Sequence, residues 1–93
     1  MSVVEETLKR IQSHRGVKGV IIMNREGIPL RTALPEEDTE TYSAVVSQIT
    51  QKAVSVVRAL DSSDDLTLLR IRSKKHELLI APDKSFILCV IQV

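Results

Sequence analysis

The clearest pattern in the sequence is a repeat of apolar positions between residues 42 and 60. Pairs of apolar residues recur eleven positions apart, and eleven steps of about 100° return to nearly the same side of a helix. The pattern predicts one long helix, entered through Pro35 and the acidic residues 36–38. We expect its stripe to face the core first and to leave area for a second copy of the chain. The stripe consists of Tyr42, Val45, Val46, Ile49, Ala53, Val56, Val57 and Leu60.

A shorter amphipathic helix is predicted at the N-terminus. Val4, Leu8 and Ile11 follow one another at helical spacing, with charged residues between them. Ser2 and Glu5 fit the capping box, in which a serine caps the first turn and a glutamate reaches back. Gly16 supplies a stop after the basic Arg15.

The remaining apolar runs have the length and composition of β-strands. Pro29 lacks an N–H, so its strand should lie at a sheet edge. Residues 24–27 read as the turn of a hairpin, with Gly27 free to take a positive φ. The almost wholly apolar run 86–91 should be a central strand that is covered on both faces. The five predicted strands are residues 17–23, 28–32, 66–72, 77–81 and 86–91.

Together these elements predict an α+β fold in the order α-β-β-α-β-β-β, with a five-stranded, mainly antiparallel sheet. We expect residues 1–93 to form a single domain. In the strand 66–72, strict alternation places Thr67, Leu69 and Ile71 on one face. The other face then carries Leu66, Leu68, Arg70 and Arg72.

Composition changes this picture by suggesting a partner chain. Tyr42 and Phe86 are the only aromatic residues, so the core of a 93-residue chain must be built from smaller side chains. Cys89 is the only cysteine, which excludes an internal disulfide; we expect a buried, inert thiol in a reducing compartment. No signal peptide and no membrane-spanning run is visible, so an intracellular chain that oligomerises is expected.

Candidate catalytic chemistry is sparse. His14, His76 and Cys89 do not fall in a metal-ligand spacing, and the glycines match neither the Walker nor the dinucleotide-binding pattern. The acidic residues 36–40 are better explained as a solvated helix start than as an acid–base pair. We therefore expect neither an enzyme nor a cofactor.

The basic segment 70–76 leaves two interpretations open. Its charges could bind nucleic acid, but no aromatic residue lies beside them and the net charge is only +1. Lys74 and Lys75 fit a charged hairpin tip. Arg70 and Arg72, which share the expected strand face with Leu66 and Leu68, favour a protein interface. Partner binding is therefore preferred over nucleic acid.

Several blocks of the sequence resemble the roadblock-type dynein light chains. They are residues 4–11, 26–29, 65–75 and 81–84, of which the block from Leu66 to Lys75 is the most diagnostic. The resemblance runs nearly the whole length of the chain in register. Residues 31–39 differ from the family pattern, and the chain ends at Val93 where family members usually carry a short polar tail.

The resemblance implies a homodimer, or a heterodimer with a paralogue, in which two sheets join edge to edge into one through the strand 66–72. It also implies binding to the dynein intermediate chain, and hence a cytoplasmic protein associated with microtubules. The alternative is a roadblock-type scaffold or regulator of a small GTPase, as found in the wider superfamily. Residue 2 is Ser rather than Gly, so no myristoylation signal supports membrane tethering.

Two sets of residues are expected to form the interfaces. The dimer interface should contain Tyr42, Val45, Val46, Ile49, Ala53, Val56, Leu66, Leu68 and Arg70. The partner-binding surface should contain Leu8, Ile11, Leu68, Arg70, Arg72 and Leu79.

Overall fold

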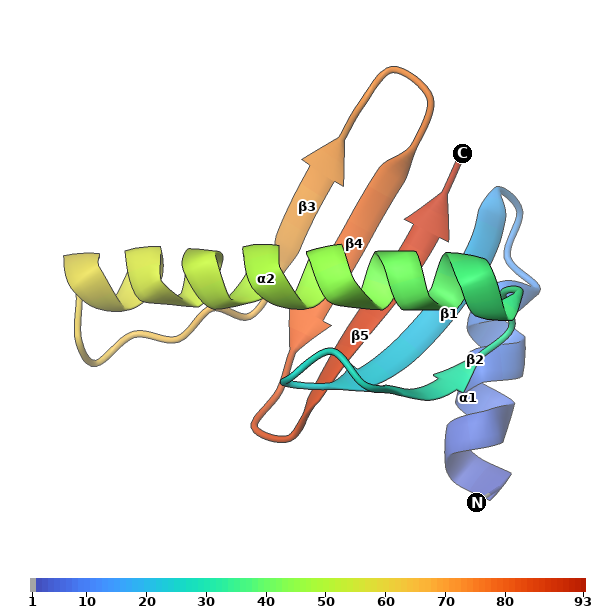
Figure 1. Ribbon diagram of the computed structural model, residues 1–93, viewed down its shortest axis with the longest axis horizontal. Coiled ribbons are helices and arrows are strands. Elements are labelled where there is room, and N and C mark those ends of the chain that lie inside the picture. Colours follow the sequence, from blue (N-terminus) through green and yellow to red (C-terminus); the bar gives the residue numbers. More distant parts are fainter. Residues whose placement is uncertain (1) are drawn as a thin grey trace.

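The computed structural model describes the backbone of residues 2–93 and the side chains from residue 5 onward. Two helices and five strands follow one another in the expected order (Figure 1), which confirms the α+β fold class. The elements are α1 (Ser2–Gln12), β1 (Val17–Asn24), β2 (Pro29–Thr32), α2 (Glu36–Leu60), β3 (Leu69–Arg72), β4 (Glu77–Pro82) and β5 (Phe86–Gln92).

The five strands form one antiparallel sheet in the order β2-β1-β5-β4-β3. β5 is the central strand, as its apolar sequence predicted, and its Cys89 pairs with Ile21 of β1 and Ile80 of β4. β2 lies at one edge and begins at Pro29, which confirms the edge position expected for a residue without an N–H. β3 forms the opposite edge.

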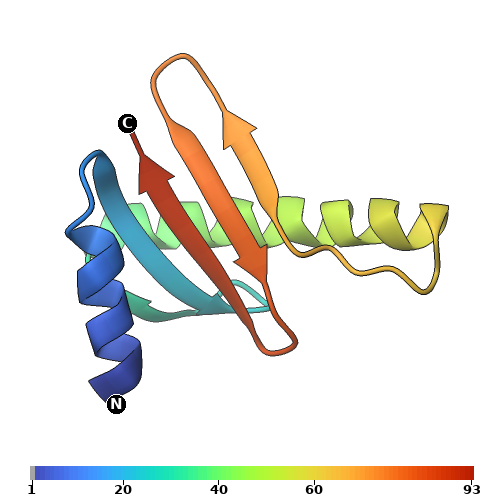
Figure 2. The same cartoon turned by 180° about the vertical axis from the view of Figure 1, so that it is seen from behind.

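The two helices cover opposite faces of the sheet (Figures 1 and 2). α2 crosses one face and contacts β1, β2 and β4, whereas α1 packs against β1 on the other face. The main core lies between α2 and the sheet. It consists of Ile21, Met23, Val46, Ile80, Ile87, Cys89 and Ile91, each at most 1% exposed.

The face that α2 presents to the sheet differs from the prediction. Of the apolar stripe only Val46 is fully buried; the other buried positions of α2 carry hydroxyl groups. Small side chains bring the helix axis close to the sheet, and most of the hydroxyls bond within or beside the helix, as when Thr50 Oγ1 donates to the carbonyl oxygen of Val46 at 2.7 Å. The buried hydroxyl residues are Thr39, Ser43, Ser47 and Thr50.

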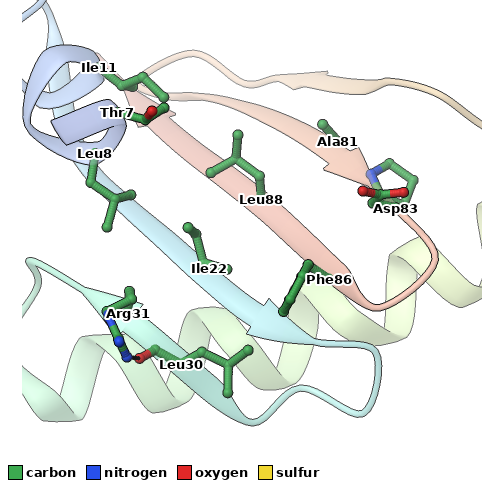
Figure 3. A pocket seen from close by; sticks show the side chains of 11 residues that line it. Thr7, Leu8, Ile11, Ile22, Leu30, Arg31, Ala81, Asp83, Phe86 and Leu88 are labelled. Carbon is green, nitrogen blue, oxygen red and sulfur yellow. Dashed lines mark hydrogen bonds between the residues drawn. The ribbon is translucent and has the colours of Figure 1, made fainter. Parts of the chain in front are cut away.

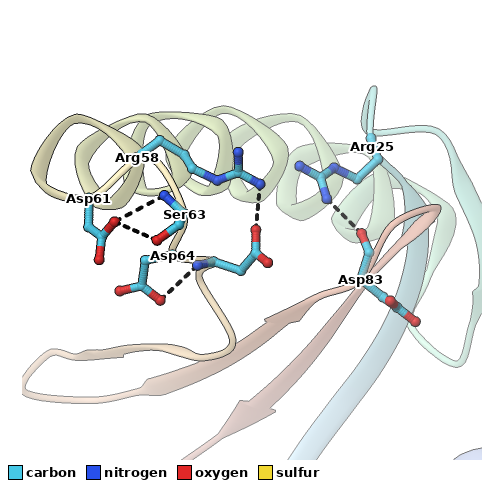
Figure 4. A network of polar contacts seen from close by, with 7 residues as sticks. Arg25, Arg58, Asp61, Ser63, Asp64 and Asp83 are labelled. Atoms are coloured by element: carbon cyan, nitrogen blue, oxygen red, sulfur yellow. Dashed lines mark hydrogen bonds and ion pairs between the residues drawn. The ribbon is translucent and has the colours of Figure 1, made fainter.

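The strand predicted at residues 66–72 is shorter in the structure and begins at Leu69, so the expected strand positions of Leu66 and Leu68 are wrong. The preceding loop is tied to the end of α2, because the carboxylate of Asp65 pairs with Arg58 at 2.5 Å. Asp61 also accepts two hydrogen bonds from Ser63 (Figure 4). These contacts keep residues 61–65 beside the end of the helix, so the strand begins only at Leu69.

Two smaller differences concern α1 and β5. The helix ends at Gln12 rather than near Arg15, although Gly16 does take a positive φ of 87°. The side chain of Ser2 lies outside the described residues, so its capping role stays a prediction. β5 is not covered at its start, where Phe86 is 48% exposed.

The turn between β1 and β2 is packed tightly against α2. Gly27 has a φ of 91°, as the sequence predicted, and the side-chain oxygen of Asn24 accepts hydrogen bonds from the N–H groups of Glu26 and Ile28. A Cβ atom at Gly27 would lie 2.6 Å from Ser47 Oγ and 3.0 Å from the carbonyl oxygen of Ser43. The turn therefore requires glycine for both its backbone conformation and its space.

Alanine replacements at Gly27 and Gly16 distinguish the requirement for a positive φ from the requirement for space, because only Gly27 lacks room for a Cβ atom. Gly16→Ala should cost about 1–2 kcal/mol of folding stability, because φ is positive but the nearest atom to a new Cβ is 3.8 Å away. Gly27→Ala adds the clash with α2 and should cost roughly 2–4 kcal/mol. Urea unfolding of both variants measures the difference. Equal losses would contradict close packing of the turn on α2.

Candidate functional site

A large apolar groove lies on the sheet face opposite α2, between α1 and the strands (Figure 3). Its volume is about 720 Å³. Leu8 and Ile11 of α1 form one wall, because the apolar stripe of that helix faces the sheet. The floor is the row of paired residues Ile22, Leu88 and Ala81 from β1, β5 and β4. The remaining lining residues are Thr7, Leu30, Arg31, Pro82, Asp83 and Phe86.

The chemistry of the groove suits a docking site for an apolar side chain or helix. Leu30 and Phe86 are 39% and 48% exposed, so the walls offer apolar area to a ligand. Charge is confined to two places: Arg31, which donates to the carbonyl oxygen of Leu30, and Asp83, whose backbone oxygen accepts from Arg25 (Figure 4).

Two further observations concern metal and membrane chemistry. Over the described part of the chain, no three metal-ligating side chains of the His, Cys, Asp and Glu types come together. Within the same residues, neither helix has the length and apolar character required to cross a bilayer.

The single thiol is buried in the core. Cys89 is 0% exposed, and its burial raises the pKa of the thiol to about 12. At neutral pH it is therefore protonated and unreactive. The expectation of an inert core cysteine is confirmed.

A second apolar surface lies on α2. Val45, Ile49, Val56 and Leu60 are 53%, 42%, 52% and 84% exposed, and they line one side of the helix. The second half of α2 extends past β3, beyond the area of its own sheet (Figures 1 and 2). Half of the predicted stripe is therefore exposed, and the other half is buried or half-buried.

The residues expected at the dimer interface fall into three groups. Val45, Ile49 and Val56 are exposed, and Ala53 is half-buried. Tyr42 packs against the core, and Val46 is only 1% exposed, so Val46 cannot contribute area to a second chain. Leu66, Leu68 and Arg70 lie in or just before the edge strand β3, where Leu68 is 56% exposed.

A cluster of charged residues lies on β3 and β4. Glu77 is 7% exposed and pairs with Arg70 (Nε to Oε2, 2.5 Å) and more distantly with Arg72 (3.6 Å). The hydrogen bond from Arg70 holds the pKa of Glu77 below its ordinary value of 4.5, although burial acts in the opposite direction. The same contact raises the pKa of Arg70. Both arginines remain largely exposed to solvent.

The residues expected to bind a partner share one sheet face, with one exception. Leu8 and Ile11 line the groove, and Arg70, Arg72 and Leu79 lie farther along the same face. Leu68 precedes β3, so strand alternation does not place it there. Sequence reasoning missed Ile22, Leu30, Phe86 and Leu88, which it treated as strand residues without a role.

The fold agrees with a comparison against protein families. The family model of the Roadblock/LC7 domain matches residues 3–92, so the chain belongs to the Roadblock/LC7 family.

Similar solved structures come from bacteria. A Roadblock/LC7 domain from Streptomyces avermitilis is 12% identical with a TM-score of 0.83, over 94% of this chain and 72% of that one. MglB from Myxococcus xanthus is 15% identical with a TM-score of 0.80, over 99% and 76%. An MglB structure with a tetrameric arrangement is 12% identical with a TM-score of 0.82, over 98% and 71%. Identities this low establish the shared fold alone.

The Glu77 cluster makes stability depend on acid pH. Because the pKa of Glu77 is lower in the folded state, the pair stabilises the fold above about pH 4.5 and is lost as pH falls through the folded-state pKa. Glu77→Gln should therefore be less stable than the wild type at pH 7 and lose less stability between about pH 5 and pH 2.

Thermal unfolding of both proteins across that range tests this expectation. A residual slope should remain, because hydrogen bonds from Ser63 lower the pKa of Asp61 as well. Glu40→Gln, an exposed acid at the start of α2, is the matched control. Parallel curves for the wild type and Glu77→Gln would contradict the role of the cluster.

Proposed function

We propose that the chain is a homodimeric, non-catalytic adaptor formed by one Roadblock/LC7 domain over residues 1–93. The observation that carries the proposal is the apolar stripe of α2, which its own sheet leaves exposed. Small domains rarely present such a surface without a partner. A tetrameric arrangement in an MglB structure supports self-association of this fold.

The unpaired outer edge of β3 also favours a dimer. β3 pairs with β4 on one side only, so its other side offers unpaired N–H and C=O groups. Antiparallel pairing of two β3 strands about a two-fold axis would join the sheets into one. In that arrangement the second half of α2, which extends past β3, would contact the second protomer, and Leu66 and Leu68 would become buried.

The apolar area favours such an association. Complete burial of a Val, Leu or Ile side chain contributes about 1.5–3 kcal/mol. Covering the exposed half of four such side chains on each protomer is therefore worth on the order of 10 kcal/mol before the cost of association.

For the partner we propose the dynein intermediate chain, on the strength of the sequence resemblance and the apolar groove. A disordered segment could order its apolar side chains in that groove, and a dimer would present two equivalent grooves. This assignment makes the protein a light chain for microtubule-based transport.

A second candidate is a scaffold or regulator of a small GTPase. Similar solved structures favour this candidate: a Roadblock/LC7 domain from Streptomyces avermitilis, MglB from Myxococcus xanthus and a gliding protein MglB from Thermus thermophilus, none of which is a motor subunit. The two candidates differ in what they require: a groove that takes an isolated peptide, or a surface that recognises a folded nucleotide-binding domain.

The homodimer is tested by a charge placed on the exposed stripe. Val56→Asp should shift the protein from dimer to monomer in sedimentation equilibrium, because each interface would bury two unpaired carboxylates. Ser55→Asp, one position away on the polar side of α2, should leave the dimer intact. A wild-type monomer at all concentrations would overturn the proposal.

The partner is tested by titration of overlapping peptides from the dynein intermediate chain and, separately, of small GTPases. Phe86→Ala removes an exposed wall of the groove and should weaken peptide binding about tenfold or more. Ile28→Ala, at a residue that is exposed to 57% against 48% for Phe86 and lies outside the groove, should not. Binding of a GTPase with no peptide bound would replace the dynein assignment by the second candidate.

A further inference from the structure

The sheet face that carries the groove continues, without interruption, to the edge strand β3. Strand pairing places Ala81 beside Leu88, and two positions along β4 it places Leu79 opposite Arg70. Two positions farther, Glu77 lies opposite Arg72. Directly paired residues share a face, so the groove floor and both arginines lie on the same side of the sheet.

α1 covers only one end of this face. Val20 of β1, beneath the helix, is 1% exposed, whereas the side chains of Arg70 and Arg72 are 63% and 74% exposed. Figure 2 shows α1 beside β1, with β4 and β3 open toward the viewer. The groove is therefore the apolar end of a longer open surface.

The other end of that surface is strongly positive. Arg70 and Arg72, with Lys74 and Lys75 of the adjoining turn, place four cations against the single carboxylate of Glu77. We call these four residues the basic belt. The chain as a whole has a net charge of only +1, so the belt, with four cations against one carboxylate, is more positive than the average of the chain. The acids that begin α2 lie with that helix on the opposite face of the sheet.

We propose that the partner segment is an amphipathic helix whose apolar residues fill the groove and whose carboxylates lie over the basic belt. The inference rests on the proposed adaptor function and specifies the chemistry of its partner. Arginine pairs well with carboxylates in a partly desolvated interface. Nucleic acid fits less well, because Tyr42 lies on α2 and Phe86 in the groove, so the belt has no Phe, Tyr or Trp ring on which a base could stack.

The geometry fixes the spacing of the partner's residues. Glu77, which pairs with Arg72, lies four residues along β4 from Ala81, and Arg72 is on the neighbouring strand. At ordinary strand dimensions, Arg72 is therefore about 14 Å from Ala81. A helix rises 1.5 Å per residue, so the acidic residues should lie about nine positions from the apolar anchor.

Dimerisation through β3 would double the charge. Two basic belts would then meet across the two-fold axis, and like charges on neighbouring strands repel. A bound acidic segment offsets this repulsion. Partner binding should therefore strengthen the dimer, more so at low salt.

Two synthetic helical peptides of about 20 residues test the proposal on the full chain. Both carry leucines at i, i+3, i+4 and i+7; one has glutamates about nine positions onward, and the other has glutamines there. At about 50 mM salt the glutamate peptide should bind about tenfold more tightly, and at about 300 mM the advantage should shrink. Fluorescence anisotropy measures both affinities.

Arg72→Gln should abolish the preference for glutamate, while the Arg70–Glu77 pair keeps the hairpin folded, as thermal unfolding would verify. Arg15→Gln, which removes an exposed cation from the turn before β1, should leave the preference unchanged.

Other outcomes separate the failure of this inference from that of the adaptor function. Equal affinities, both reduced by Phe86→Ala, would overturn the acidic specificity and leave the groove as a docking site. No binding of either peptide would overturn both. Salt-sensitive binding of single-stranded RNA that depends on Arg72, with no glutamate preference, would assign the belt to nucleic acid instead.

Discussion

The structure depends on the close approach of α2 to the sheet through small hydroxyl-bearing side chains. With few aromatic residues, the chain cannot fill a wide gap, so the helix must lie near the strands. Thr50 and Ser47 satisfy their hydroxyls on carbonyl oxygens of the helix itself. Ser43 Oγ finds no partner among the described residues, which is the penalty of this arrangement.

The same contact determines which surfaces remain open. Because the hydroxyl face of α2 turns inward, the neighbouring apolar side of the helix turns outward and overhangs β3. Because α2 occupies one face of the sheet and α1 covers only the β1 end of the other, an apolar groove and a charged strand face stay accessible. The surfaces that suit a second protomer and a partner segment are therefore both consequences of how one helix packs.

The sequence predicted the helices and strands well, but it did not predict which side of the long helix contacts the sheet. The central strand and one edge follow from local chemistry, because the apolar run of β5 marks the centre and Pro29 marks an edge. Apolar periodicity identifies a stripe, yet it does not tell whether the stripe or the adjacent serines and threonines contact the sheet. The start of β3 was misplaced because Asp65 bonds to Arg58, a contact seven residues away that alternation does not detect. The groove escaped prediction because Ile22, Leu88 and Ala81 come from three strands that only the fold brings together.

The bare edge of β3 also bears on how the protein is made. A newly folded protomer exposes a strand that any other extended chain could extend, and such edges are common starting points for aggregation. The exposed arginines on that strand oppose uncontrolled stacking, since many copies in register would align their charges. In the proposed dimer, the β3 edges of both protomers would be paired at once, so this edge could add no third copy. In the proposed dimer, prompt pairing of β3 would therefore protect a newly folded chain from aggregation.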